Sequence, residues 1–287
     1  MSDININIGS EEICKLANKI LDGIYRAVST PFQPVIAAWL AKAERIKLIS
    51  ENEIKNEIIK RNLEFTQDLL KNHSARDIRN LSNLHDVITN ALIYGKGVQS
   101  DKPIDEDWMA QFVDYAKDVS DDEIKIIWGK ILADEASEPN TYFKRTLSVL
   151  KNIEKNEAKW FSAMLAYSLD NYFPTMFVND FGYNKIQSLQ DCGLLNSSEG
   201  DYTINFDGHM QHCTIKGKSL EINICIKDDN LKIITVHRVY TLTDAGIQLS
   251  RIIDIKSDRP AFETLVERLR RDYPSFGISL SECDDNK

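Results

Sequence analysis

The segment from Asp105 to Trp160 constrains the fold most, because its large apolar side chains recur with helical spacing. The clearest run has the i, i+3, i+4, i+7 and i+8 pattern of a helix that faces a core: Ile124, Ile127, Trp128, Ile131 and Leu132. Short connections between such helices favour antiparallel packing. We therefore predict an antiparallel helical bundle over residues 101–172. Six side chains are expected in its core: Trp108, Phe112, Trp128, Ile131, Leu147 and Leu150.

Acidic residues mark the starts of the predicted helices. Asp105, Glu106 and Asp107 precede the first helix, and residues 120–123 have the Ser-x-x-Glu pattern of a capping box. Thr141 is the expected cap of a third helix. Carboxylates at helix starts are favoured by the helix dipole. We therefore assign these acids to folding, in preference to general acid–base catalysis or metal binding.

Two sequence runs in this segment carry a resemblance. They are W-G-K-I-L-A-x-E at 128–135 and R-T-L-x-V-L-K at 145–151. With the tryptophans, they resemble the core of an uncharacterised bacterial family catalogued as a domain of unknown function. They are also similar to the core of the Abi-alpha proteins, which are associated with abortive infection. The resemblance implies a bacterial, cytoplasmic or membrane-associated protein with a role in defence against phage, and it brings no catalytic residue.

Composition limits the classes of function. The chain has 287 residues, which is long enough for two domains, and its 43% hydrophobic and 28% charged residues are typical of an ordinary globular protein. Its net charge of −9 argues against a general nucleic-acid binder. The five cysteines are scattered and odd in number, as expected in a reducing compartment. The N-terminus lacks the pattern of a signal peptide, and no apolar stretch reaches about 20 residues.

Candidate metal and catalytic residues do not form a recognised pattern. The possible zinc ligands match no established finger spacing: His209, His212, Cys213, Cys225 and His237. The Glu-x-Lys sequences at 53–55 and 123–125 lie on predicted helices, whereas the corresponding nuclease motif lies on a strand. No Gly-x-Ser-x-Gly elbow is present. We predict a non-enzymatic interaction protein without a metal or cofactor.

The N-terminal region, 1–100, is predicted to be helical. Residues 24–41 include an apolar run that packs under the central helices or lies in a membrane interface, and packing is favoured because a basic flank is missing. The candidate membrane or partner contacts in this run are Phe32, Val35, Ile36, Trp39 and Leu40. Residues 42–72 predict one long helix with a narrow apolar seam and charged flanks. Such a helix mediates self-association or pairing with a protein partner, or forms a solvated arm.

The C-terminal region changes to β periodicity. Strand-like runs appear between 202 and 240, and Asp228-Asp229-Asn230 predicts a hairpin turn between the last two. A C-G-L-L turn at 192–195 and an L-T-x-A-G helix start at 242–246 accompany them, and the combination resembles a winged helix. We predict an α+β chain, mainly α, in four parts: 1–100, 101–172, a winged-helix-like domain at 173–256, and a helix with a disordered tail at 257–287.

Winged helices often bind DNA, and this alternative has its own candidate residues. They are five cations: Lys185, Lys216, Lys218, Lys232 and Arg238. The predicted recognition helix, 179–191, carries one of them beside Asp180 and Asp191, and the charge of the following strands is balanced. A phosphate-binding surface normally supplies several uncompensated cations. We therefore favour a structural or protein-binding role for this domain.

Overall fold

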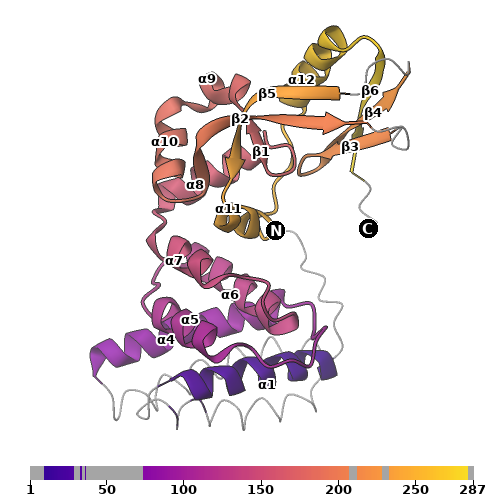
Figure 1. Cartoon of the computed structure of the whole chain (residues 1–287). Helices are drawn as coiled ribbons and strands as arrows, with labels where there is room; N and C mark the ends of the chain where they lie inside the picture. The colour runs from indigo at the N-terminus through magenta and orange to yellow at the C-terminus, as the bar shows by residue number, and fades with distance from the viewer. Residues whose placement is uncertain are drawn as a thin grey trace. The chain divides into compact units, whose positions relative to one another are not determined.

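The computed structural model describes residues 10–28, 33, 36, 74–206, 212–227 and 233–283 (Figure 1). The α+β, mainly α class predicted from the sequence is confirmed. The chain divides into two compact units, Met1–Lys151 and Asn152–Lys287. The long helix expected over 42–72 lies outside the described residues, so its proposed role in self-association stays a prediction.

In its described part, the N-terminal unit forms helices joined by short non-helical connections, and no strand. Its helices are α1 (Ser10–Ala27), α4 (Ala75–Tyr94), α5 (Glu106–Ala116), α6 (Asp122–Ser137) and α7 (Lys144–Asn152). α4 packs along α6, and α1 packs against α5 and α6. The apolar stripe of α1 is buried in this bundle, and Ile20 and Ile24 are fully inaccessible.

The core of this unit is aromatic at its centre. Trp108 stacks on Phe112 with ring centroids 5.1 Å apart, and Trp128 meets Phe112 edge-on at 5.2 Å. The Trp108 indole N–H donates to the Tyr142 carbonyl at 2.9 Å, so its one polar atom is satisfied. The structure buries all six side chains that the sequence analysis placed in the core.

Helix starts differ in detail from the expected caps. The Asp105 carboxylate accepts the backbone N–H of Trp108 at 2.8 Å, as its position before the helix suggested. The capping box at Ser120 is wrong by one residue, because the Asp121 carboxylate accepts the N–H groups of the first turn of α6. Thr141 is not the cap of α7, because that helix begins further along the chain and the Thr141 hydroxyl donates to a carbonyl behind it.

The glycine of the W-G-K run, Gly129, lies at a close contact between α6 and α4. A Cβ atom at this position would lie 2.5 Å from the Asn90 Cβ and 2.9 Å from the Ala91 backbone nitrogen. Both neighbours belong to α4, so α6 approaches α4 too closely for any side chain. The absence of a side chain at position 129 therefore allows the two helices to pack this closely.

The C-terminal unit combines short helices with two small sheets. Its helices are α8 (Lys155–Leu165), the 3₁₀-helix η1 (Thr175–Phe177), α9 (Val178–Phe181), α10 (Tyr183–Asp191), α11 (Asp244–Ser250) and α12 (Arg259–Asp272). Its strands are β1 (Tyr172–Pro174), β2 (Leu195–Asn205), β3 (His212–Lys216), β4 (Leu220–Ile226), β5 (Ile233–Leu242) and β6 (Phe276–Glu282).

The strand pairs among the described residues are antiparallel, in the orders β1-β5-β2 and β3-β4-β6. The hairpin predicted between the runs that form β4 and β5 is wrong, because these strands lie in different sheets. The expectation of a disordered tail is wrong for Ser281 and Glu282, because both belong to β6 and pair with β4. Phe276 and Ile278 of the same strand are buried. The alternating apolar residues of β6 find their partner in a strand far away in the sequence.

The L-T-x-A-G run joins α11 to the end of α10. The Thr243 hydroxyl caps α11 by accepting the Gly246 N–H at 3.0 Å and donates to the Gly193 carbonyl at 2.6 Å. A Cβ at Gly246 would lie 2.3 Å from the Leu194 carbonyl oxygen. The glycine is required because the start of α11 rests on the backbone of the C-G-L-L turn.

Candidate functional site

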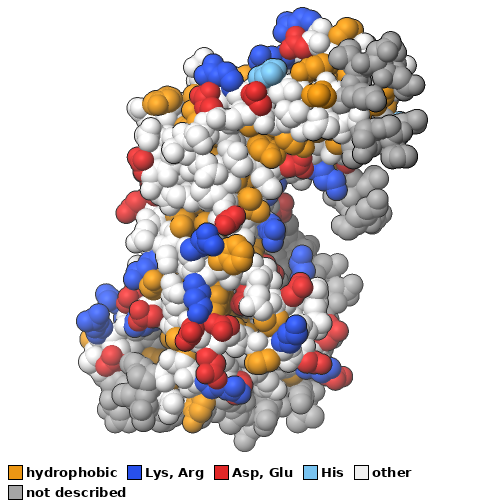
Figure 2. All heavy atoms as spheres, in the orientation of Figure 1, with side chains coloured by type: hydrophobic (Ala, Val, Ile, Leu, Met, Phe, Trp, Pro, Cys, Tyr) orange, Lys and Arg blue, Asp and Glu red, His pale blue; other side chains and the backbone are white. Residues whose placement is uncertain are grey.

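The exposed side of α7 gathers positive and aromatic side chains. The helix buries Thr146, Leu147 and Leu150, which leaves the opposite side facing outward. We call this outward side, with the neighbouring residues of α5, the α7 surface: Gln111, Tyr115, Phe143, Lys144, Arg145, Ser148 and Lys151. Figure 2 shows cations beside hydrophobic side chains over α7.

Two cations of the α7 surface are held against aromatic rings. The Arg145 guanidinium lies 5.2 Å from the centroid of the Phe143 ring, and Phe143 is 45% exposed. The Lys151 ammonium lies 4.2 Å from the centroid of the Tyr115 ring. A cation over an aromatic face is stabilised by about 0.5–1 kcal/mol at an exposed site. The rings therefore orient these charges and restrict their motion.

Hydrogen bonds link α5 to α7 beneath these cations. The Gln111 amide donates to the Ser148 hydroxyl at 3.0 Å and lies 3.2 Å from the Tyr115 hydroxyl. Hydrogen bonds from Ser148 and Gln111, together with the charge of Lys151, lower the pKa of Tyr115 from its ordinary value of 10.0. The phenol oxygen is thus an acceptor in a polar network that fixes the position of the ring.

Lys144 connects the α7 surface to the start of α5. Its ammonium lies 3.3 Å from the Asp105 carboxylate and 3.4 Å from that of Asp107. The hydrogen bond from the Trp108 backbone, followed by Lys144, lowers the pKa of Asp105 despite partial desolvation. Asp105 therefore caps α5, and both acids form ion pairs with Lys144.

The turn before Phe143 is organised by a buried acid that the sequence analysis did not identify. The Glu135 carboxylate, 1% exposed, accepts the backbone N–H groups of Asn140 at 2.7 Å and Tyr142 at 2.9 Å. Asn140 has φ 73°, a left-handed conformation that asparagine tolerates. Burial raises the pKa of Glu135 more than these hydrogen bonds lower it. The available sequence signal was an acid on the apolar stripe of α6.

Three of the candidate DNA contacts are engaged by neighbouring groups. The Lys218 ammonium donates to the Ser250 carbonyl, and burial lowers the pKa of Lys218. The Arg238 guanidinium donates to the Glu199 carboxylate at 2.9 Å and 3.3 Å. Lys185 lies 5.2 Å from the centroid of the Phe181 ring. Two of the three positive charges are thus offset by oxygen acceptors of the protein itself.

The remaining candidates from the sequence are dispersed. Lys216 is exposed at the end of β3, whereas Lys232 lies outside the described residues. Ile36 is fully buried. The other four residues of that apolar run lie outside the described residues: Phe32, Val35, Trp39 and Leu40. Within the described part of the chain, no helix has the length and apolar character needed to cross a bilayer.

The suggested zinc ligands that the structure describes do not form a metal site, and His209 lies outside the described residues. His212 pairs with Cys225 across β3 and β4, and the His237 ring nitrogen lies 3.2 Å from the Asp201 carboxylate on the other sheet. Burial and the nearby Asp170 raise the pKa of Cys213, which disfavours the thiolate that a metal would bind. No group of three or more His, Cys, Asp or Glu suited to a metal ion occurs among residues that the structure describes.

Comparison with known proteins identifies one similarity. Residues 71–177 match the model of a family described as "Protein of unknown function (DUF2806)". No curated protein and no solved structure matches the chain. The matched residues run from α4 to η1 and include the whole α7 surface.

Proposed function

We propose that this chain is a non-enzymatic interaction protein whose α7 surface binds an acidic protein partner. The observation that carries the proposal is the exposed Phe143 ring with the Arg145 guanidinium held over it. Aromatic residues and arginine are enriched at protein interfaces and dominate their binding energy. The Lys151 ammonium on Tyr115 supplies a second oriented charge on the same surface.

The charge of the α7 surface favours an acidic partner. The whole chain carries a net charge of −9, so its surface repels most acidic proteins. A local group of cations on such a chain gives a specific orientation to an encounter with an acidic surface. An apolar pocket in the partner would receive Phe143, and carboxylates around that pocket would meet Arg145 and Lys151.

The proposal is tested by affinity capture with matched variants. The full chain carrying Arg145→Glu and Lys151→Glu is compared with wild type and with Arg251→Glu, a change at an exposed arginine of the other unit. We expect the double variant to lose an acidic protein that wild type and the control both retain. The captured protein should also dissociate more readily as salt concentration rises. Retention of the same proteins by all three chains would count against the proposal.

The non-enzymatic part of the proposal has a separate test. The α7 surface presents cations and amides, but its one titratable hydroxyl with a shifted pKa, Tyr115, is held in a hydrogen-bond network with Gln111 and Ser148. We expect the purified chain to show no turnover of nucleotides and no cleavage of nucleic acid. Either activity in the purified wild-type protein would contradict the assignment.

The resemblance to the Abi-alpha proteins suggests the biological setting. We propose that the partner belongs to an anti-phage response, because the W-G-K-I-L-A-x-E and R-T-L-x-V-L-K runs that carry the resemblance also build the α7 surface and its support. Capture from infected and uninfected cells tests this setting. A partner that appears or changes on infection supports it, and an identical set of partners in both conditions argues against it.

DNA binding by the C-terminal unit is the second candidate function. Its support is topological: the short helices α9 and α10 are followed by the long antiparallel pair β2–β5, with β1 on the other side of β5, which resembles a winged helix. The charges disfavour it, because Arg238 is bound by Glu199 and Lys218 donates to Ser250. Retention of DNA that falls steeply with salt, and falls further in Lys216→Gln, would favour this candidate.

A further inference from the structure

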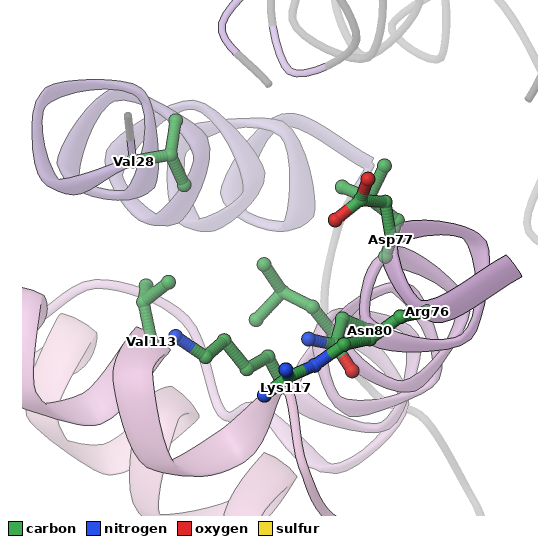
Figure 3. Close-up of a pocket in the computed structure, with 8 residues that line it drawn as sticks. Val28, Arg76, Asp77, Asn80, Val113 and Lys117 are labelled. Atoms are coloured by element: carbon green, nitrogen blue, oxygen red, sulfur yellow. The ribbon is translucent and has the colours of Figure 1, made fainter. Parts of the chain in front are cut away.

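Two features of the molecule lie apart from the α7 surface: a pocket in the N-terminal unit and an open strand edge in the C-terminal unit. The pocket, of about 290 Å³, lies between the end of α1, the first turns of α4 and the end of α5 (Figure 3). Charged groups in its lining are already engaged, because Lys117 pairs with Asp114 and the Ser74 hydroxyl donates to Asp77. The open edge belongs to β2 and leaves backbone groups without partners among the described residues.

The second part of β2 is a regular edge strand. β2 is the last strand in the order β1-β5-β2, and the irregularities in its pairing with β5 fall between Leu195 and Tyr202. From Tyr202 to Asn205 the two strands pair residue by residue. Bulges and charged side chains normally protect an edge from pairing with a foreign strand. Both devices are confined to the first part of β2, which carries Glu199 and Asp201.

The hydrogen bonds of Thr235 show which backbone groups of β2 point outward. Thr235 lies opposite Thr203, but its N–H donates to the Tyr273 hydroxyl at 3.0 Å, and its carbonyl accepts from the same hydroxyl at 3.1 Å. Thr203 and Thr235 are therefore a pair without mutual backbone hydrogen bonds, and their hydroxyls lie 3.3 Å apart. The N–H and C=O of Thr203 thus point away from β5, and those of Asn205 do so because the direction alternates along a strand.

Other strands of this unit have backbone groups covered by side chains. Tyr273 covers β5, as described above. In β3 the Lys216 N–H donates to the Asp170 carboxylate at 3.3 Å. In β6 the Ile278 carbonyl accepts from the Arg270 guanidinium at 2.9 Å. The chain thus supplies its own hydrogen-bond partners to strands that lack a neighbour on one side.

The outward groups of β2 have no such cover. Thr203 and Asn205 are exposed, and within the part of the chain that the structure describes no group hydrogen-bonds to their outward N–H and C=O. We call these outward groups the β2 edge. Unpaired groups of this kind are a ready template for a strand of another chain, and strand addition is a recurrent mode of protein recognition.

We propose that a second copy of this chain pairs with the β2 edge, antiparallel and centred on Ile204. In this register Thr203 of each copy lies opposite Asn205 of the other, so all the groups of the β2 edge find partners. The exposed threonine hydroxyl and asparagine amide also meet across the two strands. The same residues contribute from both copies, so the contact is isologous and closes as a two-fold dimer.

Charge limits the strength of this dimer. The paired segment, Tyr202–Asn205, contains no charged side chain, whereas acids flank it at positions 201 and 207 and each chain carries a net charge of −9. This repulsion is screened by salt, so the dimer should strengthen as salt concentration rises. A strand pair of this length buries less area than a standard interface, so we expect dimers only above about 1 µM chain.

Analytical ultracentrifugation of the full chain tests the pairing. We expect wild type to shift from monomer to dimer as its concentration rises, and Thr203→Pro to remain monomeric because it removes an N–H of the β2 edge. That N–H does not bond to β5, so the proline should leave the β2–β5 pairing intact, which a thermal melt checks. Thr203→Val keeps the N–H and a branched side chain, so it should dimerise nearly as wild type does.

Two double variants test the register. Thr203→Lys with Asn205→Glu places opposite charges across the dimer, and Thr203→Lys with Asn205→Lys places like charges there. We expect the first variant to dimerise about tenfold more tightly than the second at low salt. The second variant has the smaller net negative charge, so repulsion between whole chains cannot explain a weaker dimer.

Three results would overturn the proposal. They are a wild-type chain that stays monomeric at every concentration, a Thr203→Pro variant that dimerises as wild type does, and equal dimerisation of the two double variants. A monomeric wild type would leave the β2 edge to a strand of a different protein, and a dimer insensitive to Thr203→Pro would place self-association elsewhere, including the helix predicted over 42–72. Arg145→Glu with Lys151→Glu should dimerise as wild type does, so failure of this proposal and failure of the α7 proposal are distinguishable.

Discussion

The buried Glu135 carboxylate accepts the backbone N–H of Tyr142 at 2.9 Å, and the next residue along the chain is the exposed Phe143. One buried acid thus fixes the turn that presents the aromatic centre of the α7 surface. The Tyr142 hydroxyl in addition donates to Asp134 at 2.9 Å, so two successive acids of α6 hold the same tyrosine. The C-terminal end of α6 and the start of α7 are therefore tied together by hydrogen bonds before any partner is present.

Removing this acid should loosen the turn. We expect Glu135→Ala to lower the free energy of unfolding by about 1–3 kcal/mol, because it leaves the buried Tyr142 N–H without an acceptor. Urea unfolding followed by tryptophan fluorescence measures the loss. Glu138→Ala, at an exposed acid just past the end of the same helix, is the control and should change stability by less than about 0.5 kcal/mol. Equal effects of the two changes would contradict the role given to Glu135.

The same acid gives a pH dependence of known sign. Burial raises the pKa of Glu135 above its ordinary value of 4.5, so the folded state binds the proton more tightly than the unfolded state. Its contribution to stability therefore falls as pH rises from 4.5 through the folded-state pKa. We expect wild type to lose stability relative to Glu135→Gln over this range. A constant difference between the two proteins across the range would refute the assignment.

Two glycines of the C-terminal unit form a matched pair. A Cβ at Gly246 would lie 2.3 Å from the Leu194 carbonyl oxygen, whereas a Cβ at Gly200 would meet nothing within 4 Å. Gly246→Ala should destabilise the protein by about 1–3 kcal/mol through forced backbone shifts. Gly200→Ala should stay within about 0.5 kcal/mol of wild type. Thermal unfolding of both variants decides whether α11 rests on the C-G-L-L turn as described.

The ion pair between Lys125 of α6 and Asp86 of α4 makes the contact between these helices dependent on pH. The Lys125 side chain is 8% exposed and its ammonium lies 2.7 Å from the Asp86 carboxylate. Burial alone would raise the pKa of Asp86, but hydrogen bonds from His85 and Lys125 outweigh it and the pKa falls below 3.8. Because the folded-state pKa is depressed, the stabilisation is present above pH 3.8 and is lost as pH falls through the folded-state value.

Removing the charge of Asp86 should destabilise the protein more than removing the charge of its buried partner, Lys125. Asp86→Asn leaves the buried Lys125 ammonium with the exposed Asp122 carboxylate, at 3.4 Å, as its remaining counter-charge. We expect a loss of about 1–3 kcal/mol, less than for a fully buried pair because Asp86 is 39% exposed. Lys125→Met keeps the apolar stem and should cost less. Urea unfolding at neutral pH measures both losses. A larger loss of stability in Lys125→Met than in Asp86→Asn would show that the Lys125 charge itself stabilises the contact between the helices.

The helical core was accessible to sequence analysis because its signal is local. The spacing of Trp128 and Ile131 along one helix is enough to place both side chains on a buried face. Trp128→Ala should accordingly cost about 3–5 kcal/mol, and Trp128→Phe much less, since it keeps most of the volume and removes a buried indole N–H without an acceptor in the described chain. Thermal melts of the two variants separate the effects.

Contacts between residues far apart in the sequence could not be predicted from local spacing. β4 pairs with β6, so Ile222 lies opposite Leu280, and the turn chemistry at residues 228–230 wrongly favoured the neighbouring strand as partner. The α7 surface was missed for a related reason. Periodicity identifies Lys151 as exposed, but only the packing of α7 on α5 brings it over the Tyr115 ring. Burial of the charged Glu135 likewise depends on tertiary contacts, because an isolated helix would expose it.

The most direct measurement of the central proposal is photo-cross-linking from Phe143 in growing cells. A photoreactive phenylalanine analogue replaces Phe143 in one chain and Tyr183 in another, because Tyr183 is 64% exposed and lies in the other unit. We expect a covalent adduct with one acidic protein from position 143, its loss when Arg145→Glu is added, and no such adduct from position 183. An absence of adducts at position 143, or the same adducts from both positions, would contradict the proposal that α7 carries the binding surface.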